Sequence, residues 1–183
     1  MRIIAGEWRS RKLTAPEGME TRPTADRVKE ALFSILGGRV YEARVLDLYG
    51  GSGALALEAV SRGAQSAVIC DQASGACRAI RENIRSLKAE DRVRLLPMRD
   101  TAALDTLKKA GERFDLVFLD PPYRLDTAPV CARLAEGLLA PGGIIVAEHA
   151  RETPPAVQPP LIRFDFRTYG ITGLSFFKRA EEE

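Results

Sequence analysis

Val45-Leu46-Asp47-Leu48-Tyr49-Gly50-Gly51-Ser52-Gly53-Ala54-Leu55-Ala56-Leu57 decides the fold class of this chain, because an apolar run passes through three glycines into an amphipathic helical pattern. A strand that ends in a glycine turn before a helix is typical of nucleotide-binding α/β sheets. Glycine permits the tight turn and lets the backbone approach a ligand closely. Asp71 ends the next predicted strand, about 20 residues further on, where an acid can bind ribose hydroxyls. Gln72, beside it, is a weaker cofactor candidate.

Strands and helices alternate on both sides of this stretch. The pattern predicts βαβ units and a mostly parallel sheet, within one α/β domain. The N-terminal residues 2–5 and 9–13 are predicted to pair as a small β-hairpin, and Thr24 is predicted to cap a helix that ends before Gly37. At the other end, two strands joined near Tyr169-Gly170 with no helix between them are predicted to form an antiparallel pair at the sheet edge. The strands are expected at 44–49, 66–71, 92–96, 114–119, 143–148, 161–166 and 174–178, and the helices at 25–36, 53–62, 74–88, 100–110 and 127–138.

Composition excludes several classes of protein. The 183 residues are 45% hydrophobic, enough for a full core, and the formal net charge is only +2. No apolar run approaches the ~20 residues that a membrane helix needs. Cys70, Cys77 and Cys131 fit no metal spacing, and with His149 as the single histidine we expect no metal site. A reducing, cytoplasmic location is the default for such a chain.

Asp120-Pro121-Pro122-Tyr123 closes the apolar run at 114–119 and is the strongest pointer to chemistry. Proline cannot continue a sheet ladder, so the strand must stop there. The turn then presents a carboxylate, a backbone carbonyl and an aromatic ring at the carboxyl end of a strand, the edge where open α/β sheets bind ligands. Oxygens that accept from an NH2 group and a ring that stacks suit a planar base with an exocyclic amine. All four residues are therefore candidate catalytic residues.

The glycine turn alone leaves three alternatives open. Residues 51–56 also satisfy the relaxed dinucleotide fingerprint, so the turn could bind NAD or S-adenosylmethionine, or it could serve only helix–strand packing. Asp47 favours S-adenosylmethionine. A carboxylate beside the turn would repel a pyrophosphate, whereas it suits a cofactor that carries an ammonium and a sulfonium. Together with Asp120 two strands later, this predicts an S-adenosylmethionine site that includes Asp47, Gly50, Gly51, Ser52 and Gly53.

The first 13 residues are locally basic. Arg2, Arg9, Arg11 and Lys12 face only Glu7, which gives 4 − 1 = +3, and Trp8 lies among them. Such a segment could follow a phosphate backbone while its ring stacks on a base. The alternative is a solvated hairpin edge whose charges prevent aggregation.

Four segments give the chain a family resemblance. It resembles the bacterial small-subunit ribosomal RNA guanine-N2 methyltransferases called RsmD, which use S-adenosylmethionine. The glycine turn and the prolyl tetrapeptide are shared by many methyltransferases, whereas Arg22-Pro23-Thr24 is the family-specific feature. Ala5, Tyr49 and Gly50 depart slightly from the family pattern. The matching segments are residues 2–6 with 11–13, residues 21–33, residues 47–55 with 58–59 and 61–64, and residues 120–123.

The resemblance implies a Rossmann-like class I methyltransferase with seven strands, the last antiparallel, and an N-terminal hairpin over residues 1–18 that grips RNA. The implied target is a guanine in small-subunit ribosomal RNA, presented on an assembling subunit to a monomeric enzyme. We expect Arg22 and Thr24 to close the cofactor pocket or to contact RNA phosphate, with a surface salt bridge as the alternative for Arg22. Asp100 is expected beside the adenine or as the N-cap of the helix that begins at Thr101. Methylation of DNA or of protein glutamine stays open as an alternative, and so does an NAD-dependent oxidoreductase or a non-catalytic nucleotide-binding module.

Overall fold

The computed structural model describes residues 1–18, 23–122 and 124–180. Its centre is a seven-stranded sheet with the order β3-β2-β1-β4-β5-β7-β6. The first five strands are parallel, and β7 runs antiparallel to both of its neighbours. The strands are β1 (Arg44–Asp47), β2 (Ser66–Cys70), β3 (Val93–Leu96), β4 (Phe114–Leu119), β5 (Leu139–Ala150), β6 (Leu161–Tyr169) and β7 (Thr172–Arg179). The mostly parallel sheet with an antiparallel last strand is thus confirmed.

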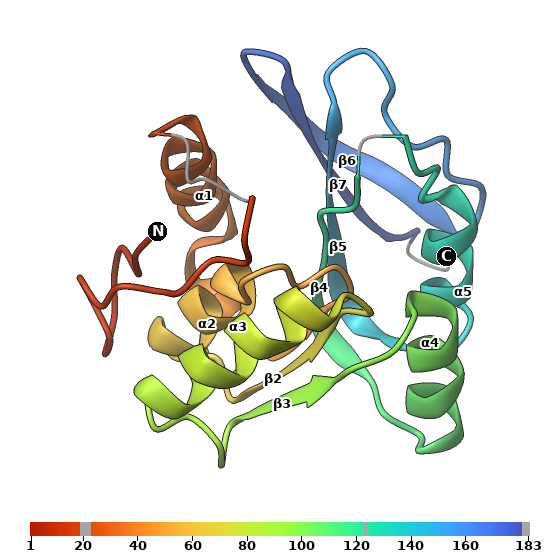
Figure 1. Cartoon of the computed structure of the whole chain (residues 1–183). Coiled ribbons are helices and arrows are strands. Elements are labelled where there is room, and N and C mark those ends of the chain that lie inside the picture. The colour runs from red at the N-terminus through yellow and green to blue at the C-terminus, as the bar shows by residue number, and fades with distance from the viewer. Residues whose placement is uncertain (19–22, 123, 181–183) are drawn as a thin grey trace.

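Helices cover both faces of the sheet, which gives three layers (Figure 1). One face packs against α1 (Pro23–Leu36), α2 (Ala54–Ser61) and α3 (Ser74–Ser86). The other packs against α4 (Asp100–Lys109) and α5 (Ala128–Ala135). Neighbouring strand residues alternate between the two cores: Leu116 belongs to the first and Val117 to the second. Burial on both faces explains why these strands read as continuous apolar runs rather than as alternating ones. A 3-10 turn, η1 (Gly37–Val40), follows α1.

Element boundaries differ from the prediction where turn residues are absorbed or excluded. β1 ends at Asp47, so Tyr49 belongs to the glycine turn, while β5 begins at Leu139 and continues past Pro141 and two glycines. A shift in the β4–β5 register between Phe114 and Leu116 accommodates those residues. Helix α1 begins at Pro23, which suits a first helical position, so Thr24 lies inside the helix by its backbone rather than before it. No helix in the described part of the chain is both long and apolar enough to cross a membrane.

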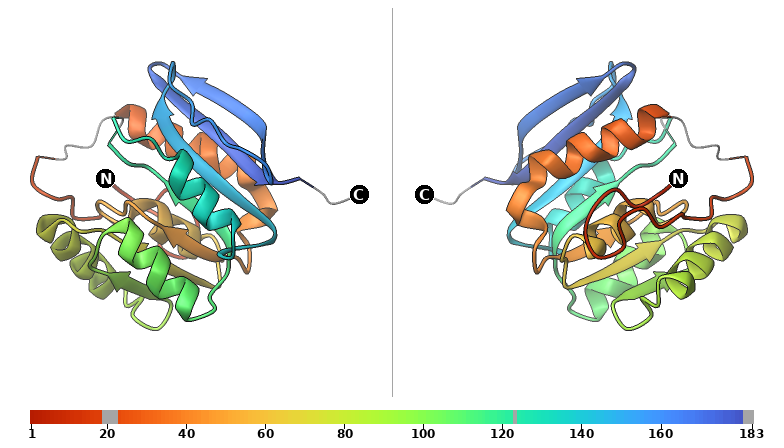
Figure 2. Two further views of the ribbon diagram at one scale, coloured as in Figure 1. Left: turned by 90° about the vertical axis from the view of Figure 1, so that its right-hand side faces the viewer. Right: turned by 90° about the vertical axis from the view of Figure 1, so that its left-hand side faces the viewer.

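The N-terminal segment turns back on itself and packs against α2 and α3 (Figure 2). An antiparallel bridge joins Arg2 to Lys12, and it stands where the sequence predicted two strands. The buried Glu58 carboxylate of α2 accepts hydrogen bonds from the backbone N–H groups of Ile4 at 2.9 Å and Ala5 at 3.0 Å. The ammonium of Lys29 lies 3.3 Å from the same carboxylate. The segment is therefore an integral part of the packed body rather than a free arm.

The position of Trp8 does not fit the prediction that its ring stacks on a base. Its side chain is only 6% exposed and belongs to the core on the α1–α3 face. The Arg92 guanidinium lies 4.8 Å from the centroid of its ring and also pairs with Glu7 at 2.9 Å. No free ring face is left in this structure for stacking on a base. The indole lies in the core because burying so large an apolar surface stabilises the folded state relative to leaving it in water.

Candidate functional site

A cleft of about 1470 Å³ lies at the carboxyl edge of the parallel strands. Its lining includes Leu48 and Tyr49 after β1, Asp71 after β2, and the Asp100 and Asp120 that follow β3 and β4. Pockets that hold a drug-sized ligand typically measure ~300–1,000 Å³, so this cleft has room for a cofactor and part of a second molecule. Residues from four strand ends meet here because parallel strands all finish at the same edge of the sheet.

The three glycines of the turn have different roles. Gly51, with φ +58°, lines the cleft. Gly50 and Gly53 face the core instead: a Cβ on Gly50 would lie 2.3 Å from Ile69 Cγ2, and one on Gly53 would lie 3.1 Å from Ile69 Cδ1. Ser52 is buried, and its carbonyl accepts a hydrogen bond from Asn83 at 2.9 Å. Ligand approach and helix–strand packing, which the sequence left as alternatives, are thus divided between neighbouring glycines.

Asp71 holds the glycine turn in place. One of its carboxylate oxygens accepts the Gly51 N–H at 2.9 Å, and the other accepts the Ala73 N–H at 2.8 Å. The side chain is half-buried and lines the cleft. Because each carboxylate oxygen has two lone pairs, these contacts leave capacity for a ligand hydroxyl. Gln72, next to it, is exposed and also lines the cleft.

Asp47 is a buried acid beneath the turn. It is 1% exposed, and burial raises the pKa of its carboxyl to about 7 although the Tyr49 and Ala56 N–H groups bind it. Its Oδ1 has no hydrogen-bond partner among the described residues. An unpartnered carboxylate oxygen in the interior is costly unless positive charge lies nearby. The site therefore favours a cationic ligand over an anionic one.

Asp120 borders the cleft at the end of β4. The residue is exposed where it lines the cleft, although protein atoms crowd its carboxyl. Burial, and then the negative charges of Glu148 and Asp47, raise the pKa of the Asp120 carboxyl well above its ordinary value. Pro121 is buried and Pro122 exposed, and both line the cleft. Tyr123 lies outside the described residues.

The remaining predicted cofactor residues are only partly described. Asp100 begins α4 and lines the cleft, and the hydroxyl of Tyr49 donates to its Oδ2 at 2.7 Å. Its Oδ1 accepts the Thr101 N–H at 2.7 Å, so Asp100 both begins the helix and faces the cleft. Arg22 lies outside the described residues, and for Thr24 the structure describes only the backbone.

One wall of the cleft was not predicted from the sequence. Residues 14–17 of the N-terminal segment line it, and Thr14 among them is hydrogen-bonded to α3. Asn83 holds them there: its Oδ1 accepts the Thr14 N–H at 2.7 Å, and its Nδ2 donates to the Thr14 carbonyl at 2.8 Å and to the Ser52 carbonyl. One buried amide thus joins the N-terminal segment to the glycine turn. A polar Asn on the apolar stripe of a predicted helix was the available signal.

The basic residues of the N-terminal segment lie on the surface. Arg2, Arg9, Arg11 and Lys12 are all exposed. The Arg11 guanidinium donates to the Ser86 carbonyl at the end of α3, at 2.7 Å. These four cations remain available to an anionic partner, unlike Trp8.

Comparison with known proteins fits this geometry. A family described as conserved hypothetical protein 95 matches residues 1–178. The Bacillus subtilis protein YlbH is 35% identical over 182 residues, which cover 98% of this chain and 99% of the relative. "Ribosomal RNA small subunit methyltransferase D" of Escherichia coli is 37% identical over 150 residues, which cover 81% of this chain and 74% of the relative. The chain belongs to the RsmD family.

Solved structures of other proteins agree with this assignment. The E. coli protein yhhF superimposes with a TM-score of 0.84 at 32% identity, over 100% of this chain and 99% of that chain. SMU.776, a protein solved in complex with SAH, has a TM-score of 0.70 at 14% identity over 86% of this chain and 50% of that chain. The latter likeness concerns the fold alone. Both comparisons support the class I methyltransferase fold for this RsmD-family chain.

Proposed function

We propose that this chain transfers a methyl group from S-adenosylmethionine to the exocyclic N2 amine of a guanine in small-subunit ribosomal RNA. The observation that carries the proposal is the shared cleft: Asp120 and Pro121 border the same cavity as Gly51 and Asp71. The cofactor and the amine can therefore meet there. Membership of an RNA methyltransferase family supports the reaction class, and the acceptor groups at Asp120 support an amine as its target.

The residues of the cleft fit S-adenosylmethionine. Asp71 would accept from the ribose hydroxyls, Asp100 would lie beside the adenine, and Gly51 would let the cofactor approach the backbone. Asp47, with its unpartnered oxygen, would stabilise positive charge from below. A nicotinamide dinucleotide carries a pyrophosphate, which these carboxylates would repel. When bound, S-adenosylmethionine supplies an electrophilic methyl group on a sulfonium ion.

Asp120 and Pro121 would position the amine. The lone pair of guanine N2 is delocalised into the ring, so the nitrogen is a poor nucleophile in its planar geometry. Hydrogen bonds from the NH2 group to Asp120 Oδ and to the Pro121 carbonyl would hold the nitrogen and favour its pyramidalisation. Positioning for in-line attack then lowers the barrier, and the Asp120 charge stabilises the positive charge that develops on nitrogen.

Asp120 would also accept the proton that the methylated nitrogen must lose. As the nitrogen–carbon bond forms and the sulfur–carbon bond breaks, the nitrogen becomes cationic and must lose one proton. The raised pKa of Asp120 makes its carboxylate a better proton acceptor than an ordinary aspartate. Tyr123, which follows Pro122 in the sequence, is the candidate ring for holding the target base outside its stack.

Methyl transfer to defined particles tests the proposal. Tritiated S-adenosylmethionine is incubated with the protein and with small ribosomal subunits from a strain that lacks the native enzyme. We expect label in the RNA and, after digestion, mass spectrometry that identifies N2-methylguanosine. Label on DNA or on protein glutamine instead would reassign the substrate, and tight NAD binding without S-adenosylmethionine binding would overturn the reaction class.

A further inference from the structure

The outer face of α3 carries three arginines in register. Arg78, Arg81 and Arg85 follow one another at i, i+3 and i+7, a spacing that places them on one side of a helix. All three side chains are exposed, while the opposite face of α3 is buried. From Arg78 to Arg85 the helix rises roughly 10 Å. We call these three residues the α3 arginine stripe.

Among the described residues, the stripe forms no ion pair, unlike several other arginines. Within residues 1–18, 23–122 and 124–180, no ion pair includes Arg78, Arg81 or Arg85. Neighbouring like charges on a helix destabilise it, and the exposed Glu82 of the same helix accepts a hydrogen bond from the Thr14 hydroxyl at 3.0 Å rather than pairing with an arginine of the stripe. The helix dipole favours a cation only in the last turn. The helix dipole therefore accounts for a cation at Arg85, in the last turn, but not for those at Arg78 and Arg81. Paired arginines elsewhere in the described chain are Arg44, Arg62, Arg92, Arg94, Arg133 and Arg167.

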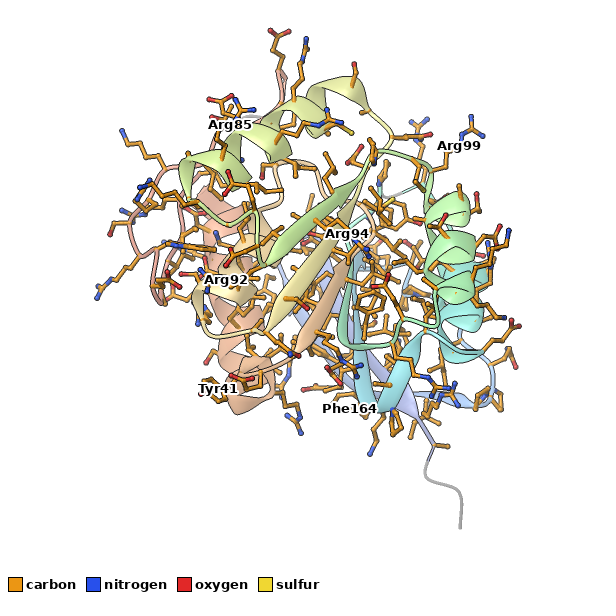
Figure 3. All side chains as sticks on the ribbon, turned by 90° about the horizontal axis from the view of Figure 1, so that it is seen from below. Tyr41, Arg85, Arg92, Arg94, Arg99 and Phe164 are labelled. Carbon is orange, nitrogen blue, oxygen red and sulfur yellow. The ribbon has the colours of Figure 1, made fainter. Side chains whose placement is uncertain are left out.

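Both ends of the stripe adjoin groups already discussed. At the cleft end, Arg78 is a lining residue, and the exposed Arg99 lines the same cleft. At the other end, Arg11 donates to the carbonyl of Ser86, the residue after Arg85. Figure 3 shows Arg85 and Arg99 at one end of the molecule and Tyr41 at the other. The stripe thus connects the basic N-terminal segment with the opening of the cleft.

We propose that the α3 arginine stripe binds the phosphate backbone of the RNA strand that delivers the target base to the cleft. This inference rests on the proposed function, because it assumes that the substrate is RNA. Guanidinium groups bind phosphate through paired N–H donors. The floor of the cleft carries carboxylates, which would repel phosphate, so the strand crosses the outer face of α3 while only the flipped base enters. The N-terminal cations extend the same track.

The double variant Arg81→Gln/Arg85→Gln tests the stripe without changing a residue that lines the cleft. Its matched control is Arg39→Gln/Arg113→Gln. This pair removes the same charge from exposed residues that precede β1 and β4, at the amino edge of the sheet. Binding of a fluorescent single-stranded fragment of small-subunit ribosomal RNA is followed by anisotropy at several salt concentrations. S-adenosylmethionine binding is measured by calorimetry on the same proteins.

For the stripe variant we expect RNA affinity to fall on the order of tenfold at 0.1 M salt, with cofactor affinity unchanged. The slope of log K against log salt should become shallower by about 1.4, since two single-strand phosphate contacts are lost. Equal RNA affinities for the stripe variant and the control would overturn the proposal. Labelled polyglutamate is measured in the same anisotropy assay. If the stripe variant lost affinity for polyglutamate but not for RNA, the proposal would also be overturned, and the stripe would be assigned to an acidic protein partner.

Failure of the stripe and failure of the proposed function give different results. If the unmodified protein methylates ribosomal RNA and the stripe variant binds RNA as well as the control does, only the stripe is refuted. If the unmodified protein transfers no methyl group to RNA, the proposed function fails whatever the variants do.

Discussion

At the scale of single residues, Asp120 combines the two properties that an amine methyltransferase needs from a carboxylate. It borders the cleft, and its surroundings raise its pKa. The first property lets it accept hydrogen bonds from a substrate NH2 group. The second lets it take the proton that the methylated nitrogen must lose. A backbone carbonyl such as that of Pro121 can share the first task but not the second.

We predict that Asp120→Asn lowers single-turnover methyl transfer on the order of 10²- to 10³-fold while S-adenosylmethionine still binds. Asparagine keeps one acceptor oxygen but carries no charge and cannot accept the proton. Asp115→Asn is the control, because Asp115 lies near the start of β4 and pairs with Arg44 at 3.0 Å. Rapid-quench assays and calorimetry give the two quantities. Equal turnover in the two variants would remove Asp120 from the chemistry.

The raised pKa of Asp47 predicts how the free energy of unfolding depends on pH. Its folded-state pKa of about 7 lies above the ordinary 3.8, so between these values the folded protein holds a proton that the unfolded chain has released. The contribution of Asp47 to the free energy of unfolding therefore falls as pH rises from about 4 to about 7 and is level above that. Asp47→Asn removes this loss. The stability of the variant relative to the original protein should rise over this range, by at most about 4 kcal/mol.

Urea unfolding without cofactor, at several pH values between 5 and 8, measures this difference. The same variant should bind S-adenosylmethionine more weakly, because the buried negative charge is gone. Stability and affinity would then move in opposite directions, as expected at a functional site. Parallel pH profiles for the two proteins would show that Asp47 is already ionised in the folded state without cofactor.

At the scale of elements, the turn between β1 and α2 shows why its ligand could not be deduced from its glycines alone. Gly50 and Gly53 face Ile69 and Gly51 faces the cleft, yet the three are equivalent in a linear pattern. Which glycine turns inward depends on how α2 packs on β2, which is a tertiary contact. Asp47 and Asp120 correctly predicted S-adenosylmethionine rather than NAD. A negative charge favours a cationic ligand whichever way the neighbouring glycines face.

Gly53→Ala should destabilise the protein by roughly 1–2 kcal/mol. Gly53 has φ +80°, which an L side chain rarely adopts, and its added Cβ would crowd Ile69. Gly75→Ala is the matched control, since Gly75 lies within α3 and a Cβ there has open space. Alanine at Gly75 should be neutral or stabilise by about 0.4–1 kcal/mol, as alanine favours helix. Thermal unfolding of both variants checks the sign, and a stable Gly53→Ala would mean that the turn relaxes freely.

At the scale of the whole molecule, the sheet could be read from the sequence because its buried strands form apolar runs separated by amphipathic helices. The β6–β7 pair was recognisable from the missing helix between its strands. Whether the N-terminal segment packs on the domain could not be predicted from the sequence, because the same basic and aromatic residues suit an exposed arm or a packed one. Glu58 decides it: a buried carboxylate on α2 requires donors, and Ile4 and Ala5 supply them. The same segment packs Trp8 into the core, where the backbone N–H of Trp8 also bonds Ser61, while Asn83 separately holds residues 14–17 at the cleft.

Deleting residues 1–13 should therefore unfold or strongly destabilise the protein rather than weaken RNA binding alone. Without this segment the Glu58 carboxylate keeps its ion pairs with Lys29 and Arg62 but loses two backbone donors, and a hydrogen bond to a charged group contributes ~1.5–3 kcal/mol. The buried side chains of Ile3, Trp8 and Leu13 are lost from the core as well. Circular dichroism melting should show a much lower midpoint for the deletion. Arg9→Gln/Lys12→Gln, which changes exposed side chains only, should keep the original midpoint and weaken RNA binding in the anisotropy assay. A deletion that melts like the intact chain would instead show that the segment is a dispensable arm.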